Sequence, residues 1–213
     1  TRLIFAETIG NPCLDVTDIE KLAEIAHAHD IPLVVDNTTS TAYLIQVLKQ
    51  GADIVVNSSS KYINGSSNAI SGILTDSGKF KWDKNRYPGF ADYVKYGPMA
   101  FIAKLRNSLF RNMGACLAPV NAYLNIIGLE TLGLRMEREC SNALELASWI
   151  ENNYPDIKVN YPGLCSSKWH EIAKKQLTNG YGAILTIRVG SKEKAFKFID
   201  SLTIPYTLSN IGD

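Results

Sequence analysis

The chain has 213 residues, of which 46% are apolar and 20% charged, a composition that excludes disordered and collagen-like proteins. Its formal net charge is +1, and Lys and Arg are scattered along the sequence. No electrostatic field would therefore gather nucleic acid or an anionic membrane, and neither is expected as a partner. No apolar run approaches the roughly 20 residues that span a bilayer, and the first residues lack the order of a signal peptide. We expect a cytoplasmic protein.

Cysteine and histidine spacing gives no metal site. The four cysteines, Cys13, Cys116, Cys140 and Cys165, lie far apart and include no C-x-x-C pair, so we expect buried, reduced thiols. The other arrangement to consider is His27-x-His29. On a helix these side chains diverge by about 100° per residue, which favours an ordinary helix surface over a metal site.

The first sixty residues alternate strand and helix patterns with short connections, which is typical of a parallel sheet with crossover helices. Thr17 to Glu20 has the form of a capping box, which predicts a helix that continues to His29. A second helix is expected to end at Gly51. The predicted elements are strands at 3–7, 31–35 and 53–56 and helices at 17–29 and 42–50.

Further along the chain the pattern changes. Residues 69–75 suggest a strand, residues 80–98 a long surface loop, and residues 100–152 two or three long helices. Strand and helix signals then return at 157–160, 171–176, 183–189 and 192–202, with a last short strand near Leu208. We expect an α/β protein with a mainly parallel sheet flanked by helices. Residues 1–128 would be part of a large domain, and residues 129–213 a linking helix and the start of a smaller C-terminal α/β domain. Because the first residue is Thr1 and a strand follows at once, and because residues 209–213 stop without a terminal helix, we also expect the natural chain to extend in both directions.

Polar residues follow three of the predicted strands: Glu7 to Pro12 follow the first, Asp36 to Thr38 the second, and Asn57 to Lys61 the third. In open α/β sheets, ligands gather at the carboxyl ends of the strands. All three polar sets are therefore expected at one edge of the sheet.

This combination of groups matches the needs of pyridoxal 5'-phosphate (PLP). The cofactor requires an amine for its aldehyde, a carboxylate for its pyridine nitrogen and donors for its phosphate. Lys61 and Asp36 supply the first two, and a carboxylate about 4 Å from the ring nitrogen favours its proton by about 4 kcal/mol at an effective dielectric of about 20. Ser58 and Ser60 offer hydroxyls to the phosphate, and Asn11 offers its amide to the phenolate oxygen.

Each of these residues has an ordinary structural explanation. An Asp after a strand is often a helix cap, a Ser-rich loop is often only a turn, and most lysines are solvated. The cofactor site is favoured because the residues with the three different roles, Asn11, Asp36 and Lys61, each follow a different strand of one predicted sheet.

The motifs together resemble the Cys/Met metabolism family of PLP enzymes, in order along nearly the whole chain. The resemblance lies in the stretches 7–12, 34–38, 51–56, 58–62, 128–138 and 160–164. It implies the aspartate-aminotransferase-like fold, fold type I. The segments 6–12, 76–80 and 134–139 are most similar to the O-acetylhomoserine sulfhydrylase branch.

The resemblance also implies roles for single residues. Lys61 would be the Schiff-base lysine, Asp36 the pyridinium partner, Asn11 the ring-oxygen contact, and Ser58 with Ser60 phosphate contacts. Asn210 falls where the family places a contact to the substrate carboxylate. The chain departs from the family after Lys61, where relatives commonly have Gly-Gly-His or Gly-His and this chain has Ile63 to Asn68.

The implied reaction is a γ-replacement on O-acetylhomoserine, in which sulfide or a thiol displaces acetate to give homocysteine or methionine. One alternative is a γ-lyase that acts on methionine or cystathionine. Another is an inactive, truncated member that binds a partner subunit, because the family's Tyr-x-Arg and Gly-rich phosphate contacts and its carboxylate-binding Arg are not found here. The resemblance further implies a homodimer or homotetramer.

Overall fold

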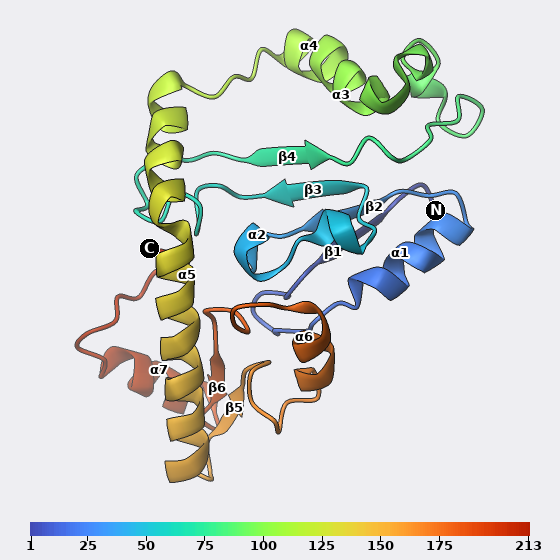
Figure 1. The fold of residues 1–213 in the computed structure, drawn as a ribbon. Coiled ribbons are helices and arrows are strands. Elements are labelled where there is room, and N and C mark those ends of the chain that lie inside the picture. Colours follow the sequence, from blue (N-terminus) through green and yellow to red (C-terminus); the bar gives the residue numbers. More distant parts are fainter.

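The computed structural model describes residues 1–213 and contains two sheets joined by a long helix (Figure 1). The larger sheet has four strands in the order β1-β2-β3-β4, and the smaller has two, β5 and β6. The strands are β1 (Ile4–Glu7), β2 (Leu33–Asp36), β3 (Ile54–Asn57), β4 (Ile73–Asp76), β5 (Lys158–Asn160) and β6 (Thr186–Arg188). The larger sheet is mainly parallel, as predicted.

The register of the first three strands aligns their carboxyl ends. Glu7 of β1 lies opposite Asp36 of β2, and Asp36 lies opposite Val56 of β3. Both pairings are parallel, whereas β4 runs antiparallel to β3. The expectation that the polar sets after β1, β2 and β3 share one edge of the sheet is therefore confirmed.

Helix α1 (Ile19–Ala28) connects β1 to β2, but its cap differs from the predicted one. The cap is Asp18, whose side chain accepts a hydrogen bond from the Lys21 backbone N–H at 3.1 Å. The capping box that begins at Thr17 is therefore wrong by one residue, because an Asp side chain performs the same task one position later. The apolar face of α1 buries Ile19, Ala23 and Ala26 against the sheet.

The single helix predicted at 42–50 is interrupted in the structure. Helix α2 (Thr41–Leu44) and a 3₁₀ helix (Val47–Gln50) lie on either side of Ile45, whose backbone is extended. The buried amide of Asn37 donates to the Ile45 carbonyl at 3.1 Å. This tertiary hydrogen bond replaces a helical one and outweighs the local helix propensity. Gly51 ends the segment in the left-handed conformation, as expected.

Two other predicted strands differ from the structure. The strand predicted at 69–75 begins only at Ile73, because Ser71 forms hydrogen bonds with Ser60 in place of a neighbouring strand. The strand predicted near Leu208 does not form. That segment instead folds back, and Gly212 packs against the backbone of Tyr62.

Residues 80–98 form a surface loop, as predicted, with the short 3₁₀ helices Pro88–Phe90 and Val94–Met99 and a cluster of aromatic rings. Trp82 stacks on Phe90 with ring centroids 4.0 Å apart and contacts the edge of Phe80. The following residues are helical over α3 (Ala100–Lys104), a π-helical turn (Leu105–Phe110) and α4 (Arg111–Met113). Packing of aromatic rings therefore orders a segment that its prolines and glycines mark as irregular.

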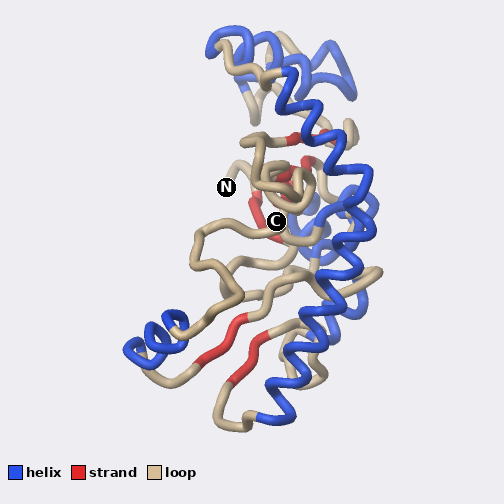
Figure 2. The backbone as a smooth tube through the Cα atoms, turned by 90° about the vertical axis from the view of Figure 1, so that its left-hand side faces the viewer, coloured by secondary structure: helices blue, strands red, loops and turns tan.

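Helix α5 (Pro119–Asn153) is 35 residues long and runs beside both sheets (Figures 1 and 2). Beyond it, β5 and β6 pair antiparallel, with α6 (His170–Gln176) between them in the chain and α7 (Lys192–Asp200) after β6. The strand and helix pattern predicted after residue 154 is thus present up to α7.

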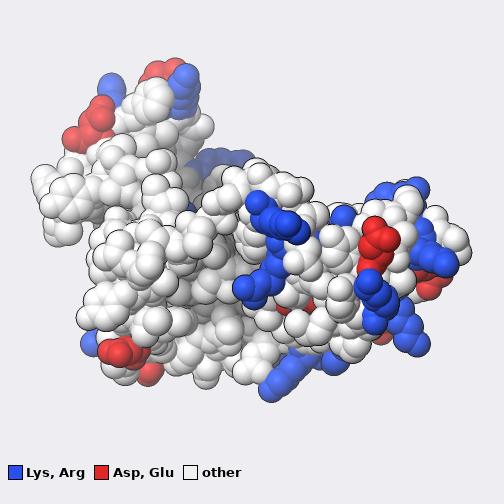
Figure 3. Space-filling view, turned by 90° about the horizontal axis from the view of Figure 1, so that it is seen from above, with Lys and Arg blue, Asp and Glu red and all other residues white.

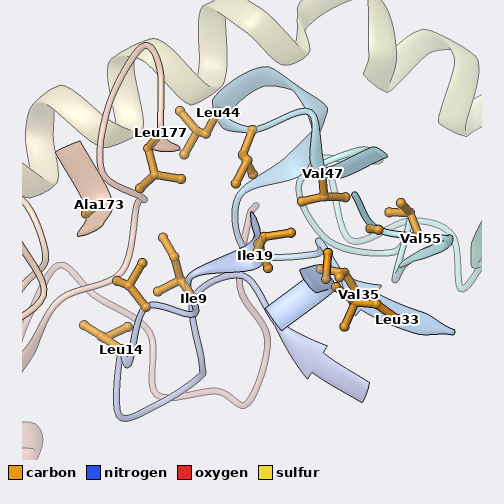
Figure 4. Close-up of a cluster of buried hydrophobic side chains, with 14 of the residues drawn as sticks. Ile9, Leu14, Ile19, Leu33, Val35, Leu44, Val47, Val55, Ala173 and Leu177 are labelled. Atoms are coloured by element: carbon orange, nitrogen blue, oxygen red, sulfur yellow. The ribbon is translucent and has the colours of Figure 1, made fainter. Parts of the chain in front are cut away.

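The main core lies between the larger sheet, α1 and α5 (Figure 4). It holds side chains from distant parts of the chain, including Ile9, Leu33, Leu44, Met136 and Leu177. The segment after α6 is therefore packed against the same core as the β-strands.

The cysteines differ from the expectation that all four are buried. All four are free thiols, but only Cys140 is buried, whereas Cys13, Cys116 and Cys165 are exposed. Sequence spacing carries no information on exposure, and these three lie in loops.

Charged side chains are spread over the surface, as they are along the sequence (Figure 3). Figure 3 shows charges of both signs with broad uncharged areas between them on one face. None of the helices is both long and apolar enough to cross a membrane. No group of three or more His, Cys, Asp or Glu residues is arranged to hold a metal ion, and His27 is hydrogen-bonded to Asp53 at 2.8 Å.

Candidate active site

Asp36 ends β2 at the shared carboxyl edge and is half-buried. Its Oδ1 atom accepts the backbone N–H of Thr38 at 2.9 Å, while its Oδ2 atom has no hydrogen-bond partner within the chain. The turn after β2 thus fixes one carboxylate oxygen and leaves the other free to accept a hydrogen bond from a ligand.

Thr38 links the loops that follow β2 and β3. Its Oγ1 atom accepts the backbone N–H of Ser58 at 2.8 Å. This contact holds the residues after Asp36 against those that lead to Lys61. Thr38 belongs to the polar set after the second predicted strand, and its hydroxyl, two residues after the aspartate, is the only sign of this role in the sequence.

The two serines predicted as phosphate contacts have different environments. The Ser60 hydroxyl donates to the Ser71 carbonyl at 3.1 Å and accepts the Ser71 N–H at 2.8 Å, so it closes the loop that contains Lys61. The Ser58 hydroxyl has no partner within the chain and remains available to a ligand. Ser59 lies between them, is buried and donates to the Ser71 hydroxyl at 2.7 Å.

Lys61 is partly buried in the turn that follows β3, and its amine donates a hydrogen bond to the side-chain carbonyl of Asn210. Asn210 reaches the amine because the C-terminal segment crosses close to the backbone. A Cβ atom on Gly212 would lie 2.6 Å from the Tyr62 backbone nitrogen, and the φ angle of Gly212 is +83°, so only glycine fits. The structure therefore brings together Lys61 and Asn210, which sequence reasoning placed in one site.

Asn11 lies at the same sheet edge, in the turn after β1, and is exposed. Its backbone N–H donates to Glu7 Oε2 at 3.0 Å, and the peptide bond to Pro12 is cis. Its side-chain amide forms no hydrogen bond within the chain and makes none with Asp36 or Lys61. The contact of Asn11 with a ring oxygen stays a prediction.

Helix α5 packs against the loop that follows Lys61. A Cβ atom on Gly128 would lie 2.3 Å from the Ile63 carbonyl oxygen, so the helix backbone and the loop are in direct contact at this glycine. The buried Asn125, one turn earlier on α5, donates to the Ser71 hydroxyl at 2.8 Å. These contacts join the Lys61 loop to the long helix.

A cavity of about 670 Å³ lies beside Asn210, between α5 and the C-terminal segment, and Tyr62 and Glu139 help to line it. Burial raises the pKa of the Tyr62 hydroxyl well above its ordinary value, and the nearby Glu139 carboxylate adds to this. Burial also raises the pKa of Glu139; the Arg135 guanidinium opposes that rise and the Asp213 carboxylate reinforces it. Tyr62 next to Lys61 is therefore a neutral hydroxyl.

These residues fit PLP. One carboxylate oxygen of Asp36 is free, the Ser58 hydroxyl is free, and the Lys61 amine follows the adjacent strand at the same edge. An acid for the pyridine nitrogen, a hydroxyl for the phosphate and an amine for the aldehyde are the groups that this cofactor needs.

The family model described as "Cys/Met metabolism PLP-dependent enzyme" matches residues 1–213, the whole chain. Among curated proteins, the homocysteine/cysteine synthase of Saccharomyces cerevisiae is 40% identical, and the O-acetyl-L-homoserine sulfhydrylase of Leptospira meyeri is 41% identical. Each alignment covers 100% of this chain and 53% of the relative. The chain thus spans about half the length of the curated relatives that it matches.

Solved structures agree with this result. A structure of the O-acetylhomoserine sulfhydrylase of Wolinella succinogenes has a TM-score of 0.87 and 46% identity over 100% of this chain and 61% of its own. A putative O-acetylhomoserine (thiol)-lyase of Campylobacter jejuni, which carries a pyridoxyl-lysine at its position 205, has a TM-score of 0.92 and 35% identity, over 100% of this chain and 56% of its own. The fold is that of PLP-dependent fold type I enzymes, and the chain belongs to the Cys/Met metabolism family of PLP-dependent enzymes.

Proposed function

We propose that the protein of which this chain is part catalyses γ-replacement on O-acetylhomoserine, with sulfide or a thiol as the nucleophile, to give homocysteine or methionine. The observation that carries this proposal is the 46% identity, over the whole chain, to the O-acetylhomoserine sulfhydrylase of Wolinella succinogenes. Curated relatives with homocysteine synthase and sulfhydrylase names, at 40% and 41% identity, support the same reaction.

In this proposal Lys61 acts first as the anchor of the cofactor and then as the base. Bound PLP supplies an electron sink for negative charge at the substrate α-carbon. The Lys61 amine takes the proton from Cα, gives it up, and then takes one from Cβ, which its long flexible side chain allows. Acetate leaves from Cγ, and sulfide or a thiol adds at the same carbon. Protons are then returned to Cβ and Cα, and the proton of the sulfur nucleophile balances the departing acetate. A carboxylate or hydroxyl side chain in place of Lys61 could not serve both as anchor and as base.

Asp36 and Ser58 would hold the cofactor in this proposal. The free Oδ2 atom of Asp36 would accept the pyridinium N–H and keep that nitrogen protonated. The free hydroxyl of Ser58, with Ser60 closing the loop, would contact the phosphate, and Asn11 the ring oxygen. Asn210 is proposed near the substrate, because its side chain reaches the Lys61 amine.

The assembly and the location are also proposals. A homodimer or homotetramer agrees with the chain's place in its family, and a cytoplasmic location agrees with four free thiols. We place the boundary between the large and the C-terminal domain near residue 128, within α5, which runs beside both sheets (Figure 1).

The reaction can be tested by supplying the full-length protein with PLP, O-acetylhomoserine and sulfide. Homocysteine as the product supports transfer, whereas 2-oxobutanoate with ammonia would mean a γ-lyase. The solved cystathionine γ-lyase of Lactobacillus plantarum is 29% identical, compared with 46% for the sulfhydrylase, which favours transfer. The Lys61→Ala variant is the control and should give neither product. Absence of both products with the wild-type protein would favour the inactive, partner-binding alternative.

A further inference from the structure

The side chain of Asn210 uses every polar atom that it has. Its Oδ1 atom accepts the Lys61 amine, and its Nδ2 atom donates to Asp213 Oδ1 at 2.9 Å and to the Ser67 hydroxyl. The Ser67 hydroxyl in turn donates to Asp213 Oδ2. Ser67 therefore accepts from Asn210 and donates to Asp213, which a serine hydroxyl can do at the same time.

This network permits only one orientation of the Asn210 amide. If the amide were turned over, the Lys61 N–H groups would lose their acceptor and the amide oxygen would face the Asp213 carboxylate. The second contact would be repulsive, because two acceptors would meet. Asp213 and Ser67 together therefore turn the Asn210 carbonyl toward Lys61.

The position of Ser67 is set by Asn64, which is buried. Asn64 Oδ1 accepts the backbone N–H groups of Ser66 and Asn68, each at 3.2 Å. This side chain folds the turn so that Ser67 adopts a φ angle of +50°, in the left-handed region that few residues other than glycine and asparagine prefer. The stretch in which the sequence departs from the Gly-Gly-His pattern is thus the one that presents the Ser67 hydroxyl to Asn210.

We propose that Ser67 is a positioning residue for Lys61. With Asp213, it holds the Asn210 carbonyl where it receives the Lys61 amine whenever that amine is not bonded to the cofactor. The amine then waits at a fixed place from which it can take the substrate protons. Both N–H groups of Asn210 are occupied by Asp213 and Ser67 in this arrangement, so its carbonyl stays turned toward Lys61. This inference rests on the proposed function, because it assumes that Lys61 is the cofactor lysine.

The first test measures the Lys61 amine itself, in full-length protein from which the cofactor has been removed. A limiting amount of acetic anhydride is added, and mass spectrometry gives the acetylation of Lys61 relative to the exposed Lys84. Removal of the Ser67 hydroxyl breaks its hydrogen bonds to Asn210 and Asp213 and should release the amine, so Ser67→Ala and Ser67→Gly should each raise this ratio about threefold.

Two comparisons distinguish the effect of losing the Ser67 hydroxyl from an effect of the Ser67 backbone conformation. Ser67→Gly relieves the positive φ angle and Ser67→Ala does not, so an equal rise in both assigns the effect to the hydroxyl. Ser66→Ala removes a neighbouring hydroxyl that has no hydrogen bond in the structure, and it should leave the ratio unchanged. An unchanged ratio in both Ser67 variants, or a rise in the glycine variant alone, would overturn the proposal.

The second test is kinetic. If Ser67 positions the base, Ser67→Ala should lower kcat about threefold, in line with the loss of its hydrogen bond to Asn210, and leave KM for O-acetylhomoserine unchanged. A higher KM with unchanged kcat would overturn the proposal, because it would mean that Ser67 affects the binding of the substrate and not the position of the base. If wild-type protein does not bond PLP at Lys61, the proposed function fails, yet the acetylation ratio still reports on the network.

Discussion

The Lys61 amine is hydrogen-bonded to the side-chain carbonyl of Asn210, although 149 positions separate the two residues in the chain. The amine follows the third strand of the larger sheet, and the amide comes from the segment after α7. The C-terminal segment therefore completes the surroundings of the Lys61 amine at the sheet edge, and changes at either end of the chain should affect the same site.

The carboxylate of Asp36 is expected to control both cofactor binding and turnover. Asp36→Asn keeps the shape but removes the charge, and a charge pair at about 4 Å interacts by about 4 kcal/mol at an effective dielectric of about 20. We expect PLP affinity to fall about tenfold or more and kcat about a hundredfold or more, as measured by cofactor titration and steady-state assay. The control is Asp15→Asn, which removes an exposed acid 3.9 Å from Lys168. If the two variants had the same PLP affinity and kcat, Asp36 would not be a cofactor contact.

Thr38 is expected to matter through the loop that it holds. Thr38→Val removes the hydroxyl that accepts the Ser58 N–H and keeps the side-chain volume. The Ser58 N–H would lose its partner, so PLP should dissociate about tenfold more readily, as measured by equilibrium dialysis. Thr178→Val, which removes a hydroxyl bonded to Leu44 away from the sheet edge, is the matched control for PLP affinity. Unchanged PLP affinity in Thr38→Val would contradict a role for this loop in cofactor binding.

Gly128 is expected to be essential for the contact between α5 and the Lys61 loop. Although Ala is the better helix former, a Cβ atom at Gly128 would lie 2.3 Å from the Ile63 carbonyl oxygen. Gly128→Ala should therefore lower the free energy of unfolding by about 1–3 kcal/mol in urea titrations. At Gly89 the nearest atom to an added Cβ is Lys104 Nζ at 3.5 Å, so Gly89→Ala should be tolerated. An unchanged free energy of unfolding in Gly128→Ala would mean that the helix and the loop are not in contact.

Cys140 should be unreactive in the native protein. Burial raises the pKa of its thiol to about 11, so only about one thiol in a thousand is ionised at pH 8. A thiol-specific dye at pH 8 should label the exposed Cys13, Cys116 and Cys165 first, and Cys140 only after denaturation. As the pH rises from 9.0, the ordinary pKa of the thiol, to about 11, the unfolded chain loses the Cys140 proton before the folded chain does. The free energy of unfolding should therefore fall over this pH range. Fast labelling of Cys140 in the native state would contradict its burial.

Much of the fold follows from periodicity, because buried strands and amphipathic helices each have their own spacing. This is why β1, β2 and β3 lie close to their predicted positions. The two or three long helices predicted at 100–152 are one long helix, α5, after the short α3 and α4. The misses are places where a tertiary contact outweighs a local preference. The bond from Asn37 to the Ile45 carbonyl interrupts a predicted helix, and the hydrogen bonds between Ser60 and Ser71 delay the start of a predicted strand to Ile73.

The sequence predicts only those parts of the site that depend on the order of the strands. Asp36 and Lys61 follow adjacent strands, so a parallel sheet must bring them to one edge. No pattern in the sequence shows that Ser60 bonds to Ser71, or that the turn at Asn64 presents Ser67 to Asn210. Such contacts depend on the packing of the loop against α5 and on the path of the C-terminal segment.

The role of Lys61 is tested by reducing the full-length, PLP-treated protein with borohydride and mapping the modified peptide. If Lys61 is the cofactor lysine, the protein is yellow before reduction, and the pyridoxyl group is then found on the peptide that contains Lys61. Lys61→Ala should not be labelled. Label on another lysine, or a colourless protein that stays unlabelled after addition of PLP, would contradict the assignment of this site.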